Sequence, residues 1–364
     1  MNLNGIVKIA LKTKIITRFL KNIFAIAVIL LVILSIGVYF ERSEGGSYFI
    51  NKQKQGDLSQ EELVVTTTLP KPLEVLVSSN QLEQGDTLVV TIENLAVETT
   101  ITGEFDKKSF DFFSTEVAGK QIGIVGIDVR KTPGDYLLKV LIDGEEKLNK
   151  KITITKGDFY VTKFVLTPEL EKQGYTQSNI VQNIQTNDGV LIYQVLDKYT
   201  PEPYFNKSFI YPLDSIIKVG DFGTTRKEGD ITLRHLGVDL DVKIGTPIYA
   251  INDGIVRFVR TLTEYGKIII IDHGFGIYSL YLHLSEFKVA VGDKVSRGEV
   301  IGLTGNTGYS LGPHLHLSIK VNGASVDPLK FIDAVNKNLP RFAPPVAGQA
   351  RQNLFSRFAQ NNAF

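Results

Sequence analysis

An apolar run from Ile23 to Phe40, free of charged residues, constrains this chain more than any other feature. At about 1.5 Å per residue the run would reach roughly 27 Å as a helix, close to the hydrocarbon thickness of a bilayer. Five basic residues and no acid precede it within residues 1–21, so the positive-inside bias places the N-terminus in the cytoplasm. We predict a cytoplasmic basic segment at 1–21 and a single-pass transmembrane signal anchor at 22–40, with the remaining chain extracytoplasmic.

The alternative to a retained anchor is a cleaved signal peptide, for which Ser35 and Gly37 supply small residues near a cut. The basic segment and the apolar run are both long for a signal peptide, which favours the anchor. Either interpretation exports the body of the chain.

The composition indicates a globular body and excludes several classes of protein. Hydrophobic residues make up 43% and charged residues 22% of the 364 residues, which fits two folded domains plus accessory segments. The absence of cysteine removes disulfides, thiolate nucleophiles and cysteine-based zinc sites. The formal net charge is +1, and because both termini are basic, the stretch between them is mildly acidic. It lacks the basic footprint of a protein that binds nucleic acid.

Short β-rich runs separated by turn residues occupy 71–156, after a polar stretch at 41–70 that indicates a stalk. In the run YLLKVLI, Tyr136, Leu138 and Val140 share one face, as in a half-buried antiparallel strand. Six or seven such strands in about 85 residues predict an immunoglobulin-like β-sandwich. No titratable constellation occurs there, so a spacer or binding role is expected rather than catalysis.

Three further segments complete the organisation. Residues 157–207 predict a linker with helical segments that packs against the region after it. Residues 208–335 are strand-rich and glycine-dense, which predicts compact antiparallel β-structure, and they hold all five histidines. The tail at 336–364 combines prolines with a basic end and is expected to be disordered. The chain is therefore predicted to be mainly β.

Four of the five histidines form spaced patterns. His235 and Asp239 are four residues apart in TLRHLGVDLD, which on a strand would put both side chains on one face, with Gly237 leaving room between them. His314 and His316 alternate in GPHLHLSIK and project from one face of a strand. His283, in YLHLS, is predicted to lie on the same side as its neighbour Tyr281.

A divalent metal site of imidazole and carboxylate explains this clustering economically. Zinc fits best, because two histidines and one aspartate leave a fourth tetrahedral position open for water. Water bound there can titrate at a pKa of about 7 and supply hydroxide. The pattern therefore predicts a catalytic rather than a purely structural metal site.

The segment 211–331 carries specific motifs in a fixed order. They are FG at 222–223, RHLGVDL, GTPIYAINDGIV, YGKIIIIDHGFGIYSLYLHLS, VGDKVSRGEVIGLTGNTG, GPHLHLSI and DPLKF. In order and spacing the segment closely resembles the LytM/lysostaphin-type zinc metalloendopeptidases of the M23 peptidase family. The resemblance implies the antiparallel duplicated hybrid motif of LytM-type peptidase domains and hydrolysis of peptide cross-links in bacterial peptidoglycan.

The resemblance also implies roles for individual residues. His235, Asp239 and His316 would hold one zinc ion per chain, and His283 and His314 would be two unliganded catalytic histidines. An unliganded imidazole can act as general base, and a protonated one can stabilise an oxyanion. The residues alone do not decide which of the two histidines takes which part.

Three other positions near these motifs carry weaker expectations. His273 matches a non-catalytic histidine of the family and is expected to be structural. Ser318 stands where family members often carry a glutamate, which puts in doubt a peripheral contact and not the metal site. Tyr281 either assists the oxyanion or packs in the core, and packing is favoured.

Two alternative functions are weighed against the peptidase. A non-enzymatic activator of other cell-wall hydrolases would have lost ligand residues, and all five positions are present here. A lipoyl- or biotinyl-carrier module is suggested by VAVGDKVSRGEVIG, but no lysine stands at the tip of a tight hairpin. The expected partners are peptidoglycan and, through residues 22–40, the lipid bilayer, with the catalytic domain on the periplasmic or cell-wall side of the cytoplasmic membrane. Oligomeric state, bond specificity and autoinhibition by the linker stay open.

Overall fold

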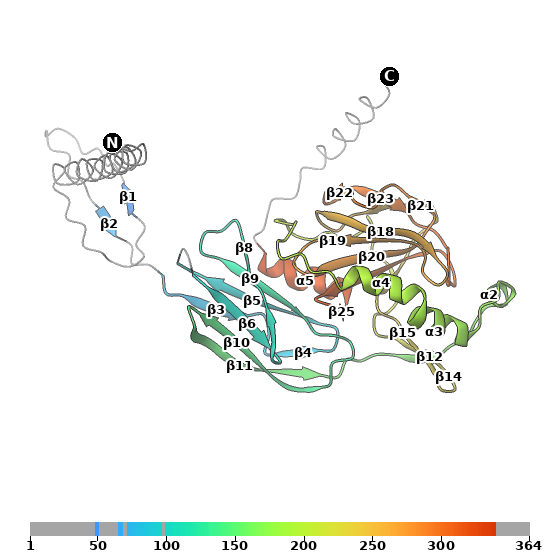
Figure 1. Cartoon of the computed structure of the whole chain (residues 1–364), viewed down its shortest axis with the longest axis horizontal. Helices are drawn as coiled ribbons and strands as arrows, with labels where there is room; N and C mark the ends of the chain where they lie inside the picture. The colour runs from blue at the N-terminus through green and yellow to red at the C-terminus, as the bar shows by residue number, and fades with distance from the viewer. Residues whose placement is uncertain (1–47, 51–64, 68–70, 97–98, 340–364) are drawn as a thin grey trace, which may run out of the picture. The chain divides into compact units, whose positions relative to one another are not determined.

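The computed structural model describes residues 48–50, 65–67, 71–96 and 99–339, and these are mainly β (Figure 1). The predicted basic segment, the predicted membrane anchor and all but the start of the predicted tail lie outside the described residues. No helix within the described ranges is both long and apolar enough to cross a membrane.

The chain divides into two units, residues 1–70 and residues 71–364. In the first unit β1 (Tyr48–Ile50) pairs antiparallel with β2 (Val65–Thr67), within the stretch predicted to be a stalk. The other described helices and strands all belong to the second unit.

Residues 74–155 form two β-sheets that face each other across a shared core. The first sheet has the order β3 (Glu74–Val77), β5 (Thr87–Glu93), β9 (Gln121–Gly126), β8 (Phe113–Ser114). The second has the order β4 (Gln81–Glu83), β11 (Glu145–Thr155), β10 (Gly134–Ile142), β6 (Ile101–Phe105), β7 (Lys108–Phe110). All pairings are antiparallel except that of β4 with β11. The predicted alternation on β10 is confirmed, because Leu138, Val140 and Ile142 are buried.

The strands β5 and β9 are apolar on both faces because both faces are covered. Leu88 and Val90 of β5 point into the core between the two sheets. Val89, between them, belongs instead to the core of residues 208–339, together with Ile122 and Ile124 of β9. Strands buried on both sides need near-continuous apolar sequence, as TLVVTIE and QIGIVG provide. One apolar core therefore joins the two-sheet domain to the region that follows it.

The predicted linker contains a short strand and three helices, and it packs on the rest of the chain. β12 (Val161–Lys163) joins a small sheet with β14 (Thr225–Glu228) and β15 (Ile231–Arg234). The helices are α2 (Pro168–Lys172), α3 (Gln177–Thr186) and α4 (Asp188–Leu196). Thr176 begins α3 with a capping box closed by Asn179.

The third region is built on an eight-stranded antiparallel sheet. Its path is β13 (Lys218–Gly220), β16 (Val238–Asp241), β24 (His314–Val321), β20 (Ile277–Leu284), β19 (Gly266–Asp272), β18 (Gly254–Leu262), β22 (Lys294–Val295), with β25 (Ala324–Val326) beside β24. A second sheet has the order β17 (Pro247–Tyr249), β23 (Val300–Leu303), β21 (Glu286–Phe287). Helix α5 (Pro328–Asn338) ends the described chain. The prediction of antiparallel β-structure for this region is confirmed.

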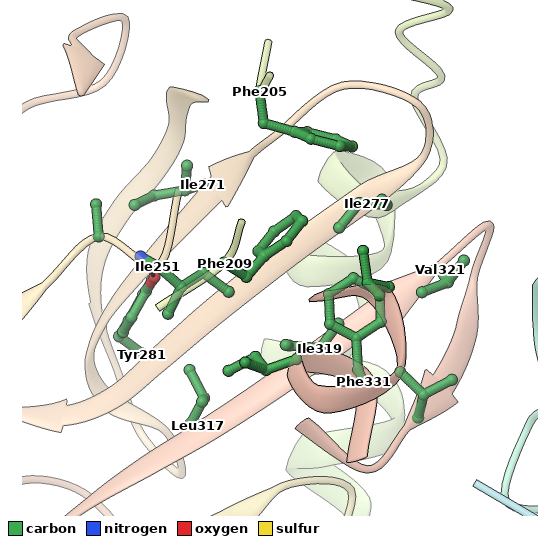
Figure 2. Close-up of a cluster of buried hydrophobic side chains, with 14 of the residues drawn as sticks. Phe205, Phe209, Ile251, Ile271, Ile277, Tyr281, Leu317, Ile319, Val321 and Phe331 are labelled. Carbon is green, nitrogen blue, oxygen red and sulfur yellow. Dashed lines mark hydrogen bonds between the residues drawn. The ribbon is translucent and has the colours of Figure 1, made fainter. Parts of the chain in front are cut away.

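The two faces of the large sheet are covered differently. On one face Tyr281, Leu317 and Ile319 pack with Phe209 and with Phe331 of α5 (Figure 2). On the other face apolar side chains of β20, among them Leu280 and Leu282, pack against Ile192 of α4. Leu282 is paired with His316 on the neighbouring strand, so the linker helices cover part of the face from which that histidine projects.

Candidate metal centre and groove

Strand pairing brings the predicted metal ligands together at the start of β24. β16 and β24 run antiparallel with Asp239 opposite His316, and β20 lies on the other side of β24. His235 is not on the same strand as Asp239, because β15 ends at Arg234 and β16 begins at Val238. The prediction that both lie on one strand face is therefore wrong, although the turn between the strands still delivers His235 to Asp239.

Three ligand atoms from these residues converge on one point. Asp239 Oδ1 lies 2.9 Å from His235 Nε2 and 2.8 Å from His316 Nδ1, and the two ring nitrogens are 2.9 Å apart. Within the described part of the chain, this is the group of His, Asp and Glu side chains placed to hold a metal ion.

Hydrogen bonds on the far side of each ring fix which nitrogen faces the cluster. His235 Nδ1 is 2.8 Å from the carbonyl oxygen of Asp221, which can only accept, so this nitrogen carries a proton. Ser318 Oγ donates to the carbonyl oxygen of Leu236 at 2.8 Å and lies 2.9 Å from His316 Nε2, so that nitrogen is the donor. In their neutral forms both imidazoles therefore present a lone pair to the Asp239 carboxylate.

A cation among the three ligand atoms would relieve their mutual repulsion, and two imidazole nitrogens with one carboxylate oxygen are ligands that suit zinc. Two lone pairs and a carboxylate oxygen repel one another unless a proton or a cation lies among them. Tetrahedral zinc takes ligand atoms at about 2.0–2.2 Å, which places neighbouring ligand atoms roughly 3.3 Å apart. The observed separations need only a few tenths of an ångström of opening to reach that value. The residues therefore fit a zinc ion.

The electrostatic state of these groups also suits a metal. Burial disfavours the charged carboxylate of Asp239, but hydrogen bonds from His235 and His316, made when a ring carries a proton on the side of the carboxylate, outweigh it and hold the pKa well below its usual range. Burial, with a smaller contribution from His235, lowers the pKa of His316 to about 4. At neutral pH the carboxylate is ionised and this imidazole is neutral, the forms in which both bind metals.

His283 and His314 lie beside the cluster with their Nε2 atoms unclaimed by carbonyl groups. His283 Nδ1 donates to the carbonyl oxygen of Thr307 at 2.8 Å, and His314 Nδ1 donates to that of Gly312 at 2.7 Å. The two ring centroids are 4.9 Å apart, and His314 Nε2 is 3.5 Å from Asp239 Oδ1. Burial, followed by the nearby His314 and His316, lowers the pKa of His283 to about 3. The hydrogen bonds at Nδ1 therefore fix the orientation of both rings and leave Nε2 of each ring able to take up or release a proton.

His283 reaches the site through an irregular backbone. Its φ is +63°, in the left-handed region that residues other than glycine rarely adopt. Regular alternation would have put it on the side of Tyr281, as the sequence predicted. Instead Tyr281 points into the core, where its hydroxyl accepts from the amide of Ile251 at 3.0 Å, while His283 lines the groove. The predicted shared face is wrong, and the packing role of Tyr281 is confirmed.

Gly237 is required because strand β24 passes directly against it. A Cβ built there would lie 2.3 Å from the carbonyl oxygen of Leu317 and 2.5 Å from His316 Nε2. The room that the sequence predicted at Gly237 is taken by the back of a ligand ring and its strand.

His273 is fully buried away from the metal cluster. Its Nδ1 donates to Asp253 O and its Nε2 lies beside Ser279 Oγ, both at 2.8 Å.

The sequence analysis expected Ser318 to make only a peripheral contact. In the structure its hydroxyl contacts the ring of the ligand His316 and so orients that ring. Replacing it with alanine leaves His316 Nε2–H without its acceptor. We expect Ser318→Ala to weaken zinc binding about 10- to 100-fold, the usual effect of losing a partner behind a ligand. Zinc affinity measured by competition with a chelator tests this. Ser279→Ala removes a buried serine that contacts His273, in the turn between β19 and β20, and is the matched control that should bind zinc as the parent does. Equal affinities in both variants would contradict the role of Ser318.

The cluster opens into a groove of about 1080 Å³. Its floor includes His314, His316, Ser318 and Lys320 of β24. Helix α4 supplies one wall with residues that include Tyr193, and the two-sheet domain contributes Arg130. Among the described residues, no side chain of 157–207 makes a hydrogen bond to the three ligand residues.

Sequence reasoning overlooked Ser318 as a support and Lys320 and Arg130 as groove residues. Strand alternation could have indicated Ser318 and Lys320, because both follow His316 at even spacing in HLHLSIK and so lie on the same face of the strand. Nothing local indicated Arg130, which reaches the groove from another domain.

Comparison with known proteins places these features in a family context. The sequence model of Peptidase family M23 matches residues 233–328. The peptidoglycan DD-endopeptidase ShyA of Vibrio cholerae is 31% identical over 240 residues, covering 63% of this chain and 53% of that protein. The DD-carboxypeptidase/endopeptidase Mpg of Neisseria meningitidis serogroup B is 44% identical over 95 residues, covering 26% of this chain and 22% of that protein.

The chain thus spans about half the length of the first of these relatives and under a quarter of the second. Among solved structures, a protein assigned to peptidase M23 from Pseudomonas aeruginosa superimposes with a TM-score of 0.50 at 26% identity. That match covers 69% of this chain and 95% of the other. It therefore extends well beyond the residues that the family model matches.

Proposed function

The chain carries a domain of peptidase family M23, and from that premise we propose that it is a zinc-dependent endopeptidase that cleaves peptide cross-links of bacterial peptidoglycan. The observation that carries the proposal is the convergence of two imidazole lone pairs and a carboxylate oxygen within 2.9 Å of one another. The named activity of the DD-endopeptidase relative from Vibrio cholerae supports the substrate class.

In this proposal His235, Asp239 and His316 hold the zinc ion. Zinc, when bound, supplies a Lewis acid that polarises a carbonyl group and lowers the pKa of water to about 7. His283 and His314 act at the reacting atoms, since each has its Nδ1 tied to a backbone carbonyl and its ring beside the cluster. One Nε2 takes the proton of the attacking water and then gives that proton to the leaving amine, and the other ring, when protonated, can donate from Nε2 to the developing oxyanion.

The groove supports the same reaction by limiting the contact of the site with water. His283, His316 and Asp239 are each less than one-tenth exposed. Apolar side chains of β20 and α4 pack against each other beside them. In such surroundings a fixed charge or dipole acts more strongly on developing charge than it would in bulk water.

Metal removal tests the proposal on the whole chain. Purified protein should contain one zinc ion per chain, lose hydrolysis of isolated peptidoglycan after treatment with a strong chelator, and recover it when zinc is added back. Mass analysis of the released fragments should show cleavage at amide bonds of the cross-linked peptides. Zinc binding without any released fragment would instead favour a non-enzymatic activator of other wall hydrolases.

We also propose that residues 22–40 anchor the chain in the cytoplasmic membrane with the peptidase outside. The support is the apolar run, the basic residues before it and the extracellular position of the polymer that it would act on. Protease protection of the N-terminus, with an accessible catalytic domain, in intact cells would test this orientation.

The two-sheet domain is proposed to be an immunoglobulin-like sandwich that orients the peptidase domain. Support comes from its sheet orders and from direct contacts. The amide of Val129 donates to Ser325 O at 3.2 Å, and the amide of Asp327 donates to Gly85 O at 2.8 Å. Because Val89, Ile122 and Ile124 also lie in the peptidase core, the two domains are expected to unfold together.

A further inference from the structure

The groove has a second chemical feature, at some distance from the metal cluster. Along β24 the side chains of His316, Ser318 and Lys320 all line the groove. At about 3.4 Å per residue, Lys320 lies roughly 14 Å along the strand from His316. The lysine is therefore too far away to act on the reacting atoms but lies on the path of an extended peptide bound in the groove.

A continuous hydrogen-bonded chain joins this lysine to the two-sheet domain. Lys320 Nζ donates to the hydroxyl of Ser325, which lies opposite it on β25. The amide of Ser325 donates to Asp128 Oδ2 at 2.8 Å. Asp128 also accepts from Arg130, at 2.8 Å from Nε and 3.1 Å from Nη2. Lys320 and Arg130 are thus held near each other by residues of two domains.

The charges at this end of the groove do not balance. Arg130, Arg234 and Lys320 line it, and Asp128 is the carboxylate within their network. Asp197 and Lys198, at the end of α4, add one charge of each sign. Burial lowers the pKa of Lys320 to about 8, so the amine still carries its charge at neutral pH. A net positive surface faces the groove here.

The unused donors point to the kind of ligand that would fit. A guanidinium has five N–H donors in a planar fork, and Asp128 takes those of Nε and Nη2. The Arg130 side chain is 66% exposed, so its remaining donors are accessible. Lysine and arginine together bind a carboxylate through charge-assisted hydrogen bonds.

We propose that Lys320 and Arg130 form a subsite that binds a free carboxylate of the peptide substrate, about four residue lengths from the bond that is cut. The distance follows from roughly 3.3–3.6 Å per residue of an extended peptide. This subsite deepens the proposed function and rests on it for the identity of the substrate. It also gives the two-sheet domain a direct part in substrate recognition, because Arg130 belongs to that domain.

A binding experiment separates the subsite from catalysis. The probe is a fluorescently labelled molecule made of two cross-linked stem peptides. It is prepared in two forms, an acid form with free carboxylates and an amide form in which every carboxylate is amidated. Binding is measured by anisotropy on the full, zinc-loaded chain carrying His314→Ala, so that turnover does not consume the probe. We expect the acid form to bind at least about 10-fold more tightly than the amide, the scale of a hydrogen bond to a charged group.

Substitutions then locate that preference. Arg130→Gln and Lys320→Met should each reduce the acid-over-amide ratio while leaving the affinity for the amide unchanged. Arg130 is exposed and methionine matches the lysine stem in size, so both variants should fold. The matched controls are Arg260→Gln, an exposed arginine on β18, and Lys267→Met, whose Nζ donates to Ser285 O at 2.6 Å; neither residue lines the groove.

The outcomes distinguish this subsite from the proposed function. Equal binding of acid and amide, no measurable binding of the acid form, or equal weakening of both forms by the variants would overturn the subsite. A carboxylate preference that the two substitutions remove would support it even if the parent chain released no fragments from peptidoglycan. In that case the peptidase proposal would fail alone.

Discussion

Asp239→Ala is expected to abolish zinc binding and hydrolysis together. It removes one of three ligand atoms that meet within 2.9 Å, and no other carboxylate belongs to the group. Zinc affinity should fall by more than the roughly 100-fold that the loss of a supporting partner produces. Bound metal after gel filtration and release of peptides from isolated peptidoglycan are the two measurements. His316→Ala should behave in the same way.

Thermal unfolding gives an independent readout of the same substitution. A ligand at about 1,000 times its dissociation constant stabilises the folded state by roughly 4.1 kcal/mol, so added zinc should raise the Tm of the parent chain. Asp239→Ala should show no such rise. Without metal the variant should unfold no higher than the metal-free parent, because the lowered pKa of Asp239 means that its ionised carboxylate stabilises the folded state.

Asp241→Ala is the matched control for this change. It removes the same charge from the same strand, β16, but Asp241 is exposed and lies outside the ligand group. Its zinc content, zinc-dependent Tm and activity should equal those of the parent. Retention of zinc by Asp239→Ala, or its loss from Asp241→Ala, would remove the basis for the metal site.

The parts of this site that sequence could predict are those that follow regular strand geometry. The alternation in HLHLSIK places His314 and His316 on one face, and both do line the groove. The same rule failed for His283, because a residue at φ +63° breaks the alternation and no local sequence pattern indicates that angle. It failed for His235 as well, since two strands and a turn span the interval that was interpreted as one strand.

Contacts between distant segments were out of reach for a different reason. The strands QIGIVG and TLVVTIE are apolar on both faces, which indicates a second covering layer but does not identify it. The structure shows that one face packs on the peptidase core. Arg130 reaches the groove through that packing, so its position depends on how two domains associate rather than on its own neighbours in sequence.

His283→Ala and His314→Ala are expected to keep zinc and lose turnover. Neither residue belongs to the three-atom ligand group, and each ring lies beside that group with Nδ1 tied to a carbonyl. Removing a general acid or base typically lowers the rate by about 10²- to 10⁴-fold. Zinc content should stay at one ion per chain, KM should change little, and each variant should lose one limb of the pH–rate profile.

His283 needs a companion variant because of its backbone. Alanine at φ +63° is strained, so a loss of activity in His283→Ala could reflect a shifted strand rather than the missing imidazole. Asparagine tolerates this conformation well and cannot act as a base. If the imidazole is what matters, His283→Asn should keep the Tm and zinc content of the parent and be as inactive as His283→Ala. Recovery of turnover in His283→Asn would show that His283 only shapes the strand, and loss of zinc from it would make His283 part of the metal site.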